Sequence, residues 1–245
     1  MVKGIFITGT DTGVGKTIVA AGLALALRRA GLSVVAVKPY ATGAIKKIGA
    51  WISGDGEILA EASGSGLSAR ETTPCLLRAP LAPAAAALEK NPGEVVRFDK
   101  VVRRTKKLIA RSDVAIIEGI GGLLVPLDEE RTVADLAKAL GFPLLIVARA
   151  GLGTLNHTLL TLEAARRRKL RIAGVVLCEA ARVRGDFSAK SNRKMLAERA
   201  GVPIFGPIRF RRNLAGRELG AQDVRELPDL SMLIRALLTA PEAVP

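Results

Sequence analysis

The stretch Gly9-Thr10-Asp11-Thr12-Gly13-Val14-Gly15-Lys16-Thr17 joins the apolar, strand-like run Val2–Thr8 to a helix-like run that begins near Lys16. Its glycines let successive backbone N–H groups turn toward one point, and the N-terminus of a helix adds the positive end of its dipole. Lys16 supplies a mobile cation, and Thr17 supplies a hydroxyl that can ligate magnesium. The stretch therefore predicts a phosphate-binding loop, with a glycine-rich turn capped by a threonine as the alternative.

The glycine spacing of this stretch departs by one position from the Walker A pattern. Counted back from Lys16, the first glycine of the pattern would fall on Thr10, and Gly9 comes one residue early. The order of strand, loop and helix is nevertheless the context that the pattern requires. We therefore keep the prediction that this loop binds phosphate.

Length and composition bound the fold and the location of the protein. A chain of 245 residues with 49% hydrophobic content fits one α/β domain over residues 1–245. It has no run of about 18 apolar residues such as a membrane span needs, and it starts with a strand rather than a secretory leader. We expect a cytoplasmic protein with no membrane partner.

Cysteine and histidine are too sparse for a disulfide framework or a zinc site. Cys75 and Cys178 lie far apart in apolar surroundings, and His157 is the only histidine of the chain. We therefore expect neither kind of site, and His157 can serve either helix packing or function.

The chain is strongly basic, with a formal net charge of +14 and a pI near 10.5. In Lys100–Arg111 the apolar residues fall on one helical face and the cations elsewhere, which is typical of a solvated helix. A second basic cluster, Arg166–Lys169, ends another predicted helix, where cations suit the helix dipole. Aromatic residues, which could stack on bases, make up only 3%. We expect solvated surface rather than a nucleic-acid groove.

Strand-like and helix-like runs alternate along the chain, which predicts an α/β fold with a doubly wound, mostly parallel sheet and helices on both faces. Pro39–Gly56 is glycine-rich and predicts a mobile, irregular loop. The predicted strands are Val2–Thr8, Ser33–Val37, Asp113–Ile117, Pro143–Ala148, Leu170–Cys178 and Pro203–Ile208. The predicted helices are Ile18–Arg29, Glu57–Ala62, Ala84–Glu89, Lys100–Arg111, Thr132–Leu140, Thr154–Arg167, Ala189–Arg199 and a closing helix after Asp229.

Three oxygen-bearing side chains could meet at the phosphate loop if the sheet assembles in this way. Thr17 follows the loop, Asp55 lies beyond the second strand, and Glu118 ends the predicted central strand. Magnesium prefers such hard oxygen ligands and keeps several waters, so a hydroxyl and one or two carboxylates suffice. Asp55 could instead be a loop or helix-capping aspartate. Glu118 is harder to explain otherwise, because an acid at the end of an apolar strand is costly without a partner.

Lys38 ends the buried strand Ser33–Val37 at the edge of the sheet where ligands bind in open parallel folds. There it would place a second cation beside the phosphates, where it could stabilise charge on a transferring phosphoryl group. The alternative is a lysine that extends from a strand end into solvent. The loop that follows carries Tyr40 and Trp51, which could cover a substrate or simply pack.

The predicted helix that opens at Thr154 offers another anion site. It has free N–H groups after a glycine turn, with the Asn156 amide nearby. We expect that a carboxylate could bind there.

Four motifs together resemble dethiobiotin synthetase, over most of the chain. Two of them, the phosphate loop and Glu-Gly-Ile-Gly-Gly (118–122), are common among P-loop proteins. More specific are Lys-Pro-Tyr-Ala-Thr-Gly (38–43) and Leu-Gly-Thr-Leu-Asn-His-Thr (152–158) in this order. The resemblance implies a P-loop NTPase fold and a homodimeric enzyme. Such an enzyme closes the ureido ring of dethiobiotin from 7,8-diaminononanoate, CO2 and ATP.

In that family the substrate amine becomes a carbamate, which attacks the γ-phosphate to give a mixed anhydride that the second amine closes. The resemblance implies that Lys16 and Lys38 stabilise the transferred charge. It also implies phosphate contacts from Thr12, Gly13, Val14, Gly15, Lys16 and Thr17, magnesium ligands in Thr17, Asp55 and Glu118, and diamine contacts from Thr42, Gly119, Gly121 and Gly122. The substrate carboxylate would lie on Gly153, Thr154 and Asn156 of the partner subunit, which is why a dimer is implied.

The chain departs from the family pattern around the nucleotide. Gly13 stands where the family often has Glu. In the base-contacting segments, Cys178-Glu179 stands where an Asn commonly reads the adenine, and Arg209 replaces a usual Pro before Phe210 and Arg211. A thiol cannot supply the paired donor and acceptor of an amide, so the resemblance does not extend to strict adenine selectivity.

Two other classes of P-loop protein share parts of the pattern. A chromosome-partitioning or septum-positioning ATPase, which acts as a switch, would carry a signature lysine five residues before Lys16, where this chain has Asp11. A glutamine-dependent amidoligase for cobyrinate would need a glutaminase domain with a catalytic cysteine, and we expect no room for one in 245 residues. DNA binding that falls steeply with salt, without turnover of a diamine, would favour the partitioning class.

Overall fold

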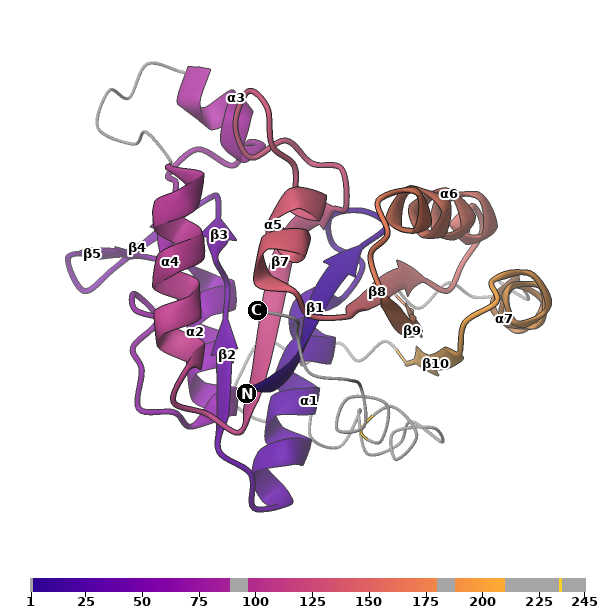
Figure 1. Ribbon diagram of the computed structural model, residues 1–245, viewed down its shortest axis with the longest axis horizontal. Coiled ribbons are helices and arrows are strands. Elements are labelled where there is room, and N and C mark those ends of the chain that lie inside the picture. Colours follow the sequence, from indigo (N-terminus) through magenta and orange to yellow (C-terminus); the bar gives the residue numbers. More distant parts are fainter. Residues whose placement is uncertain (1, 89–96, 180–187, 210–233, 235–245) are drawn as a thin grey trace.

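The computed structural model describes residues 2–88, 97–179, 188–209 and 234. Strands and helices alternate along most of the chain (Figure 1). The strands are β1 (Lys3–Gly9), β2 (Val34–Val37), β3 (Tyr40–Ala41), β4 (Ile45–Lys47), β5 (Ala50–Ile52), β6 (Cys75–Leu76), β7 (Val114–Gly122), β8 (Leu144–Arg149), β9 (Ile172–Cys178) and β10 (Ile204–Ile208). The helices are α1 (Lys16–Arg29), α2 (Gly54–Ser63), α3 (Pro83–Leu88), α4 (Phe98–Ile109), α5 (Val133–Leu140), α6 (Thr154–Arg167) and α7 (Ser188–Arg199).

Within the described residues, six strands form one parallel sheet in the order β10-β9-β8-β1-β7-β2. The chain runs from β1 out to β2, returns to β7, and continues on the other side of β1 with β8. The strand order therefore reverses next to β1, and the phosphate loop follows that strand. Ligands bind at such a reversal, at the carboxyl ends of the strands.

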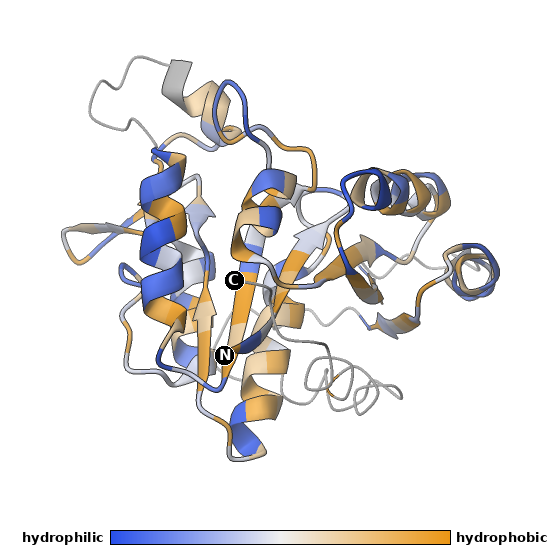
Figure 2. Cartoon of the chain, viewed as in Figure 1, coloured by the Kyte–Doolittle hydropathy of each residue, from blue (hydrophilic) through white to orange (hydrophobic). Residues whose placement is uncertain are grey.

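Apolar side chains point to both faces of the sheet, because each strand is buried on both sides. Along β1, Ile5 and Ile7 pack with α1 and α2 in one cluster, whereas Phe6 packs with α4 and α5 in another. A third cluster holds α6 and α7 against β8 and β9. Figure 2 shows the strands as the most hydrophobic part, with helices that are hydrophilic on their outer sides. The predicted doubly wound α/β fold is confirmed.

The prediction of an irregular loop over Pro39–Gly56 is wrong. The segment forms β3 and then an antiparallel hairpin of β4 and β5. The hairpin turns at Ile48 and Gly49, which both have positive φ, and two such residues make a tight turn that suits the twist of a hairpin. A β-branched isoleucine is a rare residue in this conformation, so the turn could not be predicted from residue preferences.

The N-terminus of α2 also differs from the prediction. The helix begins at Gly54, and the side chain of Ser53 accepts a hydrogen bond from the Gly56 amide at 3.0 Å. Asp55 therefore lies in the first turn of the helix, where a carboxylate suits the dipole, and not in a loop before it.

The central strand β7 is longer than predicted. It continues past Ile117 to Gly122, with Glu118 opposite Ile7 and Gly122 opposite Gly9 on β1. The prediction that the strand stops at Glu118 is wrong, because pairing with β1 carries the strand through the acid and the glycines. Glu118 is consequently enclosed by the sheet rather than placed at its rim.

Other predicted ends agree with the structure. The α6 helix has the predicted bounds, and Thr132 and Asp135 form the predicted capping box at the start of α5. The closing helix after Asp229 lies outside the described residues. Among the described residues, no helix combines the length and the apolar character needed to cross a bilayer.

The close contact between β1 and β7 predicts a difference between two glycine substitutions. In Gly4→Ala the new Cβ would lie 2.5 Å from the Ala115 carbonyl oxygen and 2.8 Å from the Phe142 ring, whereas in Gly54→Ala it would meet nothing within 4 Å. We expect Gly4→Ala to lower the free energy of unfolding by about 1–3 kcal/mol. Gly54→Ala, in the first turn of α2, should change it by less than about 1 kcal/mol, in the stabilising direction. Urea unfolding measures both, and equal effects would contradict the packing described here.

Candidate functional site

A cavity of about 600 Å³ opens at the carboxyl ends of β1, β2 and β7. The phosphate loop forms one wall, and the segments after β2 and β7 form the others. Its lining residues are Thr12, Gly13, Gly15, Lys16, Thr17, Ile18, Lys38, Thr42, Asp55, Ile58, Pro80, Leu81, Ala82, Glu118, Ile120, Gly121 and Val125. The cavity thus contains the cations and the oxygen-bearing side chains that the sequence singled out.

The phosphate loop holds Lys16 against its own backbone. The Lys16 ammonium donates a hydrogen bond to the Asp11 carbonyl oxygen at 2.8 Å. A Cβ on Gly9 would lie 2.7 Å from that same oxygen and 2.9 Å from the Lys16 Nζ. The early glycine is therefore needed for the close approach of the lysine, which explains the spacing that departs from the Walker A pattern.

The first turn of α1 is open to an anion. The residue before the helix is Gly15, at φ +100°, and no side chain caps the helix. The free backbone N–H groups of a first helical turn and the helix dipole attract negative charge. Burial and the nearby Lys38 lower the pKa of Lys16 to about 8. A phosphate group in this position would meet N–H donors and an adjacent ammonium.

Thr17, Asp55 and Glu118 converge within hydrogen-bonding distance. The Thr17 hydroxyl lies 3.1 Å from Asp55 Oδ1 and 2.9 Å from Glu118 Oε1. These residues come from α1, α2 and β7, so the packing of three elements brings them together. The predicted convergence of the hydroxyl with the two acids is present.

Lys38 lies between the same two carboxylates. Its ammonium is 2.5 Å from Glu118 Oε1 and 2.8 Å from Asp55 Oδ2. The lysine side chain is 4% exposed and that of Glu118 is fully buried, so the alternative of a lysine that extends into solvent is wrong. The sequence predicted that Lys38 and the acids share one edge of the sheet, but not that they pair with each other.

Burial and pairing shift the pKa values of this cluster. Burial raises the pKa of Glu118 above its usual range. Burial alone would lower the pKa of Lys38, but the negative charges of Glu118 and Asp55 raise it. Burial alone would raise the pKa of Asp55, but the positive charge of Lys38 has the larger effect, so the pKa of Asp55 is lowered. Lys38 and Asp55 therefore stay charged near neutral pH.

The cluster fits the chemistry of magnesium. Glu118 Oε2 is buried and has no hydrogen-bond partner, so one oxygen of the enclosed carboxylate is left to a further group. The cluster offers oxygen donors only, from one hydroxyl and two carboxylates. In the part of the chain that the structure describes, no three or more His, Cys, Asp or Glu side chains are grouped so that they could hold a metal ion by themselves. Magnesium needs fewer protein ligands, because it keeps waters and takes phosphate oxygens.

The other predicted site residues are divided among four places. Thr42 and Gly121 line the cavity, whereas Gly119 is packed between Phe6 and Val133. Gly122 lines a neighbouring groove of about 590 Å³ beside α6, together with His157. Gly153 and Asn156 are exposed at the start of α6, and Thr154 is buried beneath them. None of these three α6 residues lines the cavity of the same chain.

Of the predicted base-contacting residues, Cys178 lies beside the loop. Its Sγ would lie 3.2 Å from a Cβ on Gly15, and burial raises the pKa of the thiol to about 12. Glu179 follows at the end of β9, and Arg209 is exposed after β10. Phe210 and Arg211 lie outside the described residues.

One ion pair at the loop was missed from the sequence. Arg149, the last residue of β8, lies 2.8 Å from Asp11 Oδ2, and Asp11 Oδ1 accepts a hydrogen bond from the Thr12 amide. Like Lys38, Arg149 is a cation at the carboxyl end of a buried strand. The same sequence pattern therefore predicts that Arg149 lies near the ligand edge of the sheet. Asp11 is thereby fixed at the position where the partitioning ATPases carry their lysine.

Comparisons with known proteins give the family of the chain. A family described as "AAA domain" matches residues 3–218. The chain is 52% identical over 175 residues to the ATP-dependent dethiobiotin synthetase BioD of Anaeromyxobacter dehalogenans strain 2CP-C, which covers 71% of this chain and 76% of that protein. The protein of the same name from Thermodesulfovibrio yellowstonii is 35% identical over 241 residues, covering 96% and 99% of the two chains.

Solved structures share the fold at low sequence identity. Cobyrinic acid a,c-diamide synthase from Mycobacterium smegmatis, with a bound ATP analogue and magnesium, has a TM-score of 0.58 at 19% identity, over 100% of this chain and 98% of that one. The cell division ATPase MinD of Pyrococcus furiosus has a TM-score of 0.57 at 18% identity, over 97% and 100%. These similarities concern the fold alone.

The buried cluster predicts a contrast between two ion pairs of equal length. Lys38–Glu118 and Lys47–Glu57 both measure 2.5 Å, but the second pair is 52% and 44% exposed. Glu118→Gln should lower the free energy of unfolding by about 3–5 kcal/mol, because it leaves Lys38 buried with a weakened counter-charge. Glu57→Gln should cost at most about 1 kcal/mol.

Denaturant unfolding measures this contrast, and a double variant tests its cause. Lys38→Met combined with Glu118→Gln removes the orphaned charge, so it should be more stable than Glu118→Gln alone. Similar losses for Glu118→Gln and Glu57→Gln would show that the buried pair has no special role.

Proposed function

The chain belongs to the AAA-domain family and, with the relatives above, to the ATP-dependent dethiobiotin synthetases, and on that membership we propose what its cavity does. The protein is an ATP-dependent ligase of biotin synthesis that acts on small molecules. We propose that it closes the ureido ring of dethiobiotin from 7,8-diaminononanoate, CO2 and ATP, in the cytoplasm where ATP is abundant. The observation that carries this proposal is the convergence of Thr17, Asp55, Glu118 and Lys38 beside an open phosphate loop.

The nucleotide phosphates would lie on the loop from Thr12 to Thr17. The free N–H groups of the first turn of α1 face the cavity there, and Lys16 can exchange the Asp11 carbonyl for a phosphate oxygen. Thr17, Asp55 and Glu118 would hold magnesium. Bound magnesium would neutralise charge on the terminal phosphates.

In the proposed reaction one amine of the substrate takes up CO2 to form a carbamate, and the carbamate oxygen attacks the γ-phosphorus and displaces ADP. The second amine then attacks the carbonyl carbon of the mixed anhydride, displaces inorganic phosphate and closes the ring. Lys38, held by Glu118 and Asp55, would stabilise the negative charge of the carbamate and of the transferring phosphoryl group. Thr42 and Gly121 line the same cavity and would position the diamine.

A second copy of the chain would supply the site for the substrate carboxylate. The start of α6, with Gly153 and Asn156, is exposed and lies outside the cavity of its own chain. Around it, Leu152 is 86% exposed and Leu160 is 56% exposed, and Leu160 lines the groove beside α6. Exposed apolar side chains that gather in this way favour a protein interface. We therefore propose a homodimer in which α6 of one subunit completes the cavity of the other.

The nucleotide base would lie near Cys178, Glu179 and Arg209. The buried, protonated thiol of Cys178 cannot imitate the two hydrogen bonds of an amide. We propose that other nucleoside triphosphates can replace ATP more readily here than a base-reading amide would allow.

Replacing Lys38 tests the proposed mechanism. Lys38→Met keeps the length of the side chain but removes its charge, and it should reduce product formation about 10²- to 10³-fold. The affinity for ADP should stay within about threefold, because the loop itself is unchanged. Mass detection of the ureido product gives turnover, and ATP hydrolysis should require both the diamine and bicarbonate. The exposed Lys47→Met is the matched control, and a Lys38→Met variant with full turnover contradicts the assignment.

Mixing two variants that are each impaired at a different part of the site, with the diamine well below the raised KM, tests the shared site. Asn156→Asp puts a negative charge where the substrate carboxylate would bind, so it should raise the KM for the diamine. In mixed dimers of Lys38→Met and Asn156→Asp subunits, one site regains both native residues. After subunit exchange we therefore expect about a quarter of the native activity. Activity no greater than the sum of the two separate variants would mean that each chain completes its own site.

A further inference from the structure

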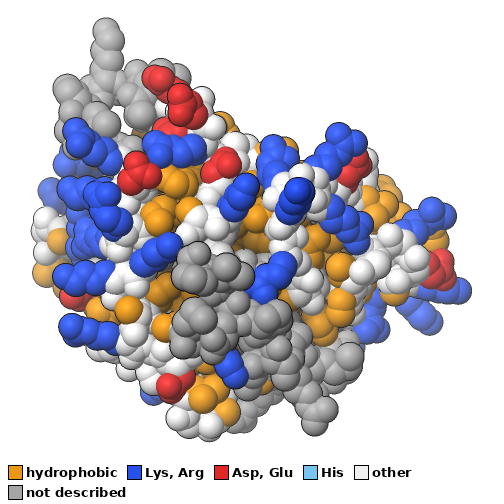
Figure 3. Space-filling model, viewed as in Figure 1, with side chains coloured by type: hydrophobic (Ala, Val, Ile, Leu, Met, Phe, Trp, Pro, Cys, Tyr) orange, Lys and Arg blue, Asp and Glu red, His pale blue; other side chains and the backbone are white. Residues whose placement is uncertain are grey.

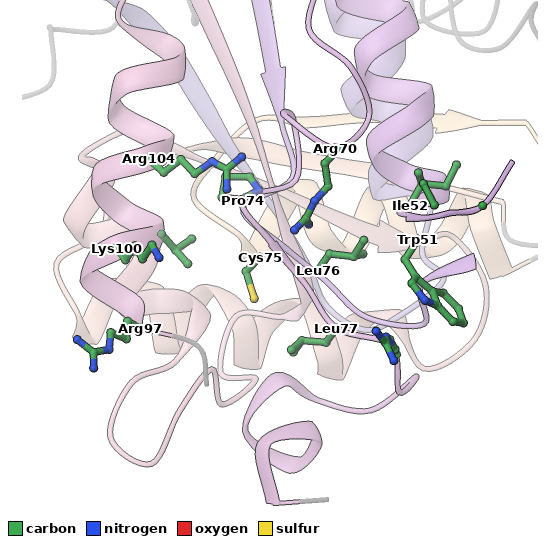
Figure 4. A pocket seen from close by; sticks show the side chains of 14 residues that line it. Trp51, Ile52, Arg70, Pro74, Cys75, Leu76, Leu77, Arg97, Lys100 and Arg104 are labelled. Atoms are coloured by element: carbon green, nitrogen blue, oxygen red, sulfur yellow. The ribbon is translucent and has the colours of Figure 1, made fainter. Parts of the chain in front are cut away.

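A second cavity, of about 710 Å³, lies between helix α4, the β4–β5 hairpin and β6 (Figure 4). It shares no lining residue with the cavity at the phosphate loop. Its floor is the segment from Pro74 to Leu77, and Figure 4 shows α4 on one side of it and Trp51 on the other. Nothing in the proposed reaction uses this cavity.

Five cations from three segments line this cavity, and no acid does. Arg97, Lys100 and Arg104 come from α4 and the residue before it, at spacings of three and four that place them along one face of the helix. Arg70 and Arg78 come from the segments on either side of β6. Within the described residues, Arg70, Arg97, Lys100 and Arg104 form no ion pair. Figure 3 shows lysine and arginine side chains gathered along the edge of the molecule where α4 lies.

Across the cavity from the cations of α4 lies an indole, with Arg78 beside it. Trp51 is 39% exposed, and the Arg78 guanidinium lies over its ring at 5.2 Å from the centroid. Leu76 and Leu77 add apolar surface to the floor. A ligand that satisfies both sides needs a flat aromatic part and a multiply charged anionic part.

We propose that this cavity binds a nucleoside polyphosphate, with the base against Trp51 and the phosphates on Arg97, Lys100 and Arg104. Base-on-indole stacking and phosphate–guanidinium pairing are the contacts that such a ligand makes with proteins. The volume falls in the range of small-molecule sites. A nucleic acid needs a groove that continues along the surface, whereas these cations converge from three segments on one hollow. The inference goes beyond the proposed function and does not depend on it.

The cavity is connected to the first site through the backbone. Its floor strand β6 pairs with β3, so that Cys75 lies opposite Tyr40, two residues after Lys38. On the other side, Trp51 and Ile52 precede the cap of α2, which carries Asp55. A ligand in the cavity would therefore contact the segment before α2 directly, and would reach the segment after Lys38 only through β6.

The experiment uses Trp51, because it is the only tryptophan of the chain and its fluorescence reports on the cavity directly. Lys16→Ala is used as the background, in magnesium-free buffer, so that the phosphate loop binds nucleotide poorly. ADP should then change the fluorescence saturably. Arg97→Gln with Arg104→Gln should weaken ADP binding at least about tenfold. The matched control is Arg103→Gln with Lys107→Gln, which removes two exposed charges of the same helix that do not line the cavity and should leave binding unchanged.

Two further probes identify the ligand class. Inorganic tripolyphosphate, which has no base, should bind at least about tenfold more weakly than ADP. A short single-stranded oligonucleotide should also bind more weakly than ADP. Circular dichroism and thermal unfolding establish that each variant is folded before it is titrated.

Four results would overturn the proposal. These are the absence of a saturable change with ADP, equal losses in the two double variants, equal binding of tripolyphosphate and ADP, and tighter binding of the oligonucleotide. The second result would indicate a general surface charge, and the last a nucleic-acid surface. Product formation by the Arg97→Gln and Arg104→Gln variant with native Lys16 is measured separately, so a failure here is distinguishable from a failure of the ligase assignment.

Discussion

The buried ammonium of Lys38, between the carboxylates of Glu118 and Asp55, is the constraint on which the rest of the structure depends. A charge removed from water is tolerated only if opposite charges surround it at close range. Lys38 follows β2, Glu118 lies within β7 and Asp55 lies in the first turn of α2, so sheet and helix must be assembled correctly before the charges can compensate one another. The arrangement that compensates the buried charges is therefore the same arrangement that shapes the cavity. The loop with Lys16 and Thr17 is fixed by the same assembly, because Thr17 bonds to both acids.

Much of the fold could be predicted from the sequence, because the buried strands are apolar runs and the helices carry clear end signals. The starts of two helices were predicted well, one from Thr132 with Asp135 and the other from the glycine before Thr154. The failures have physical reasons. The β4–β5 hairpin turns at an isoleucine with positive φ, which no propensity predicts, and β7 passes through Glu118 because its partner strand, distant in sequence, supplies the pairing.

The same distinction applies to the site. The rule that parallel strands end together predicts that Lys38, Asp55 and Glu118 lie near one another, and the structure brings them into contact, although β7 continues past Glu118. That the lysine pairs with the acids depends on distances of a few ångströms, which topology alone does not determine. The alternatives raised by the sequence, a septum-positioning ATPase and a cobyrinate-type amidoligase, share this fold with the chain at 18–19% identity. Fold similarity therefore could not separate the three classes, whereas the relatives at 35–52% identity could.

The hydrogen bond from Lys16 to the Asp11 carbonyl has a consequence for the entropy of binding. Ordering a free lysine side chain costs up to about 2 kcal/mol. In this loop the side chain is already ordered by the protein's own backbone, so most of that cost falls on folding and little on the capture of nucleotide. An incoming anion must compete with the Asp11 carbonyl oxygen for the Lys16 ammonium. A singly charged anion such as chloride competes less well than a phosphate group. The resting loop thus already holds its lysine where the oxygen atoms of a polyphosphate would lie.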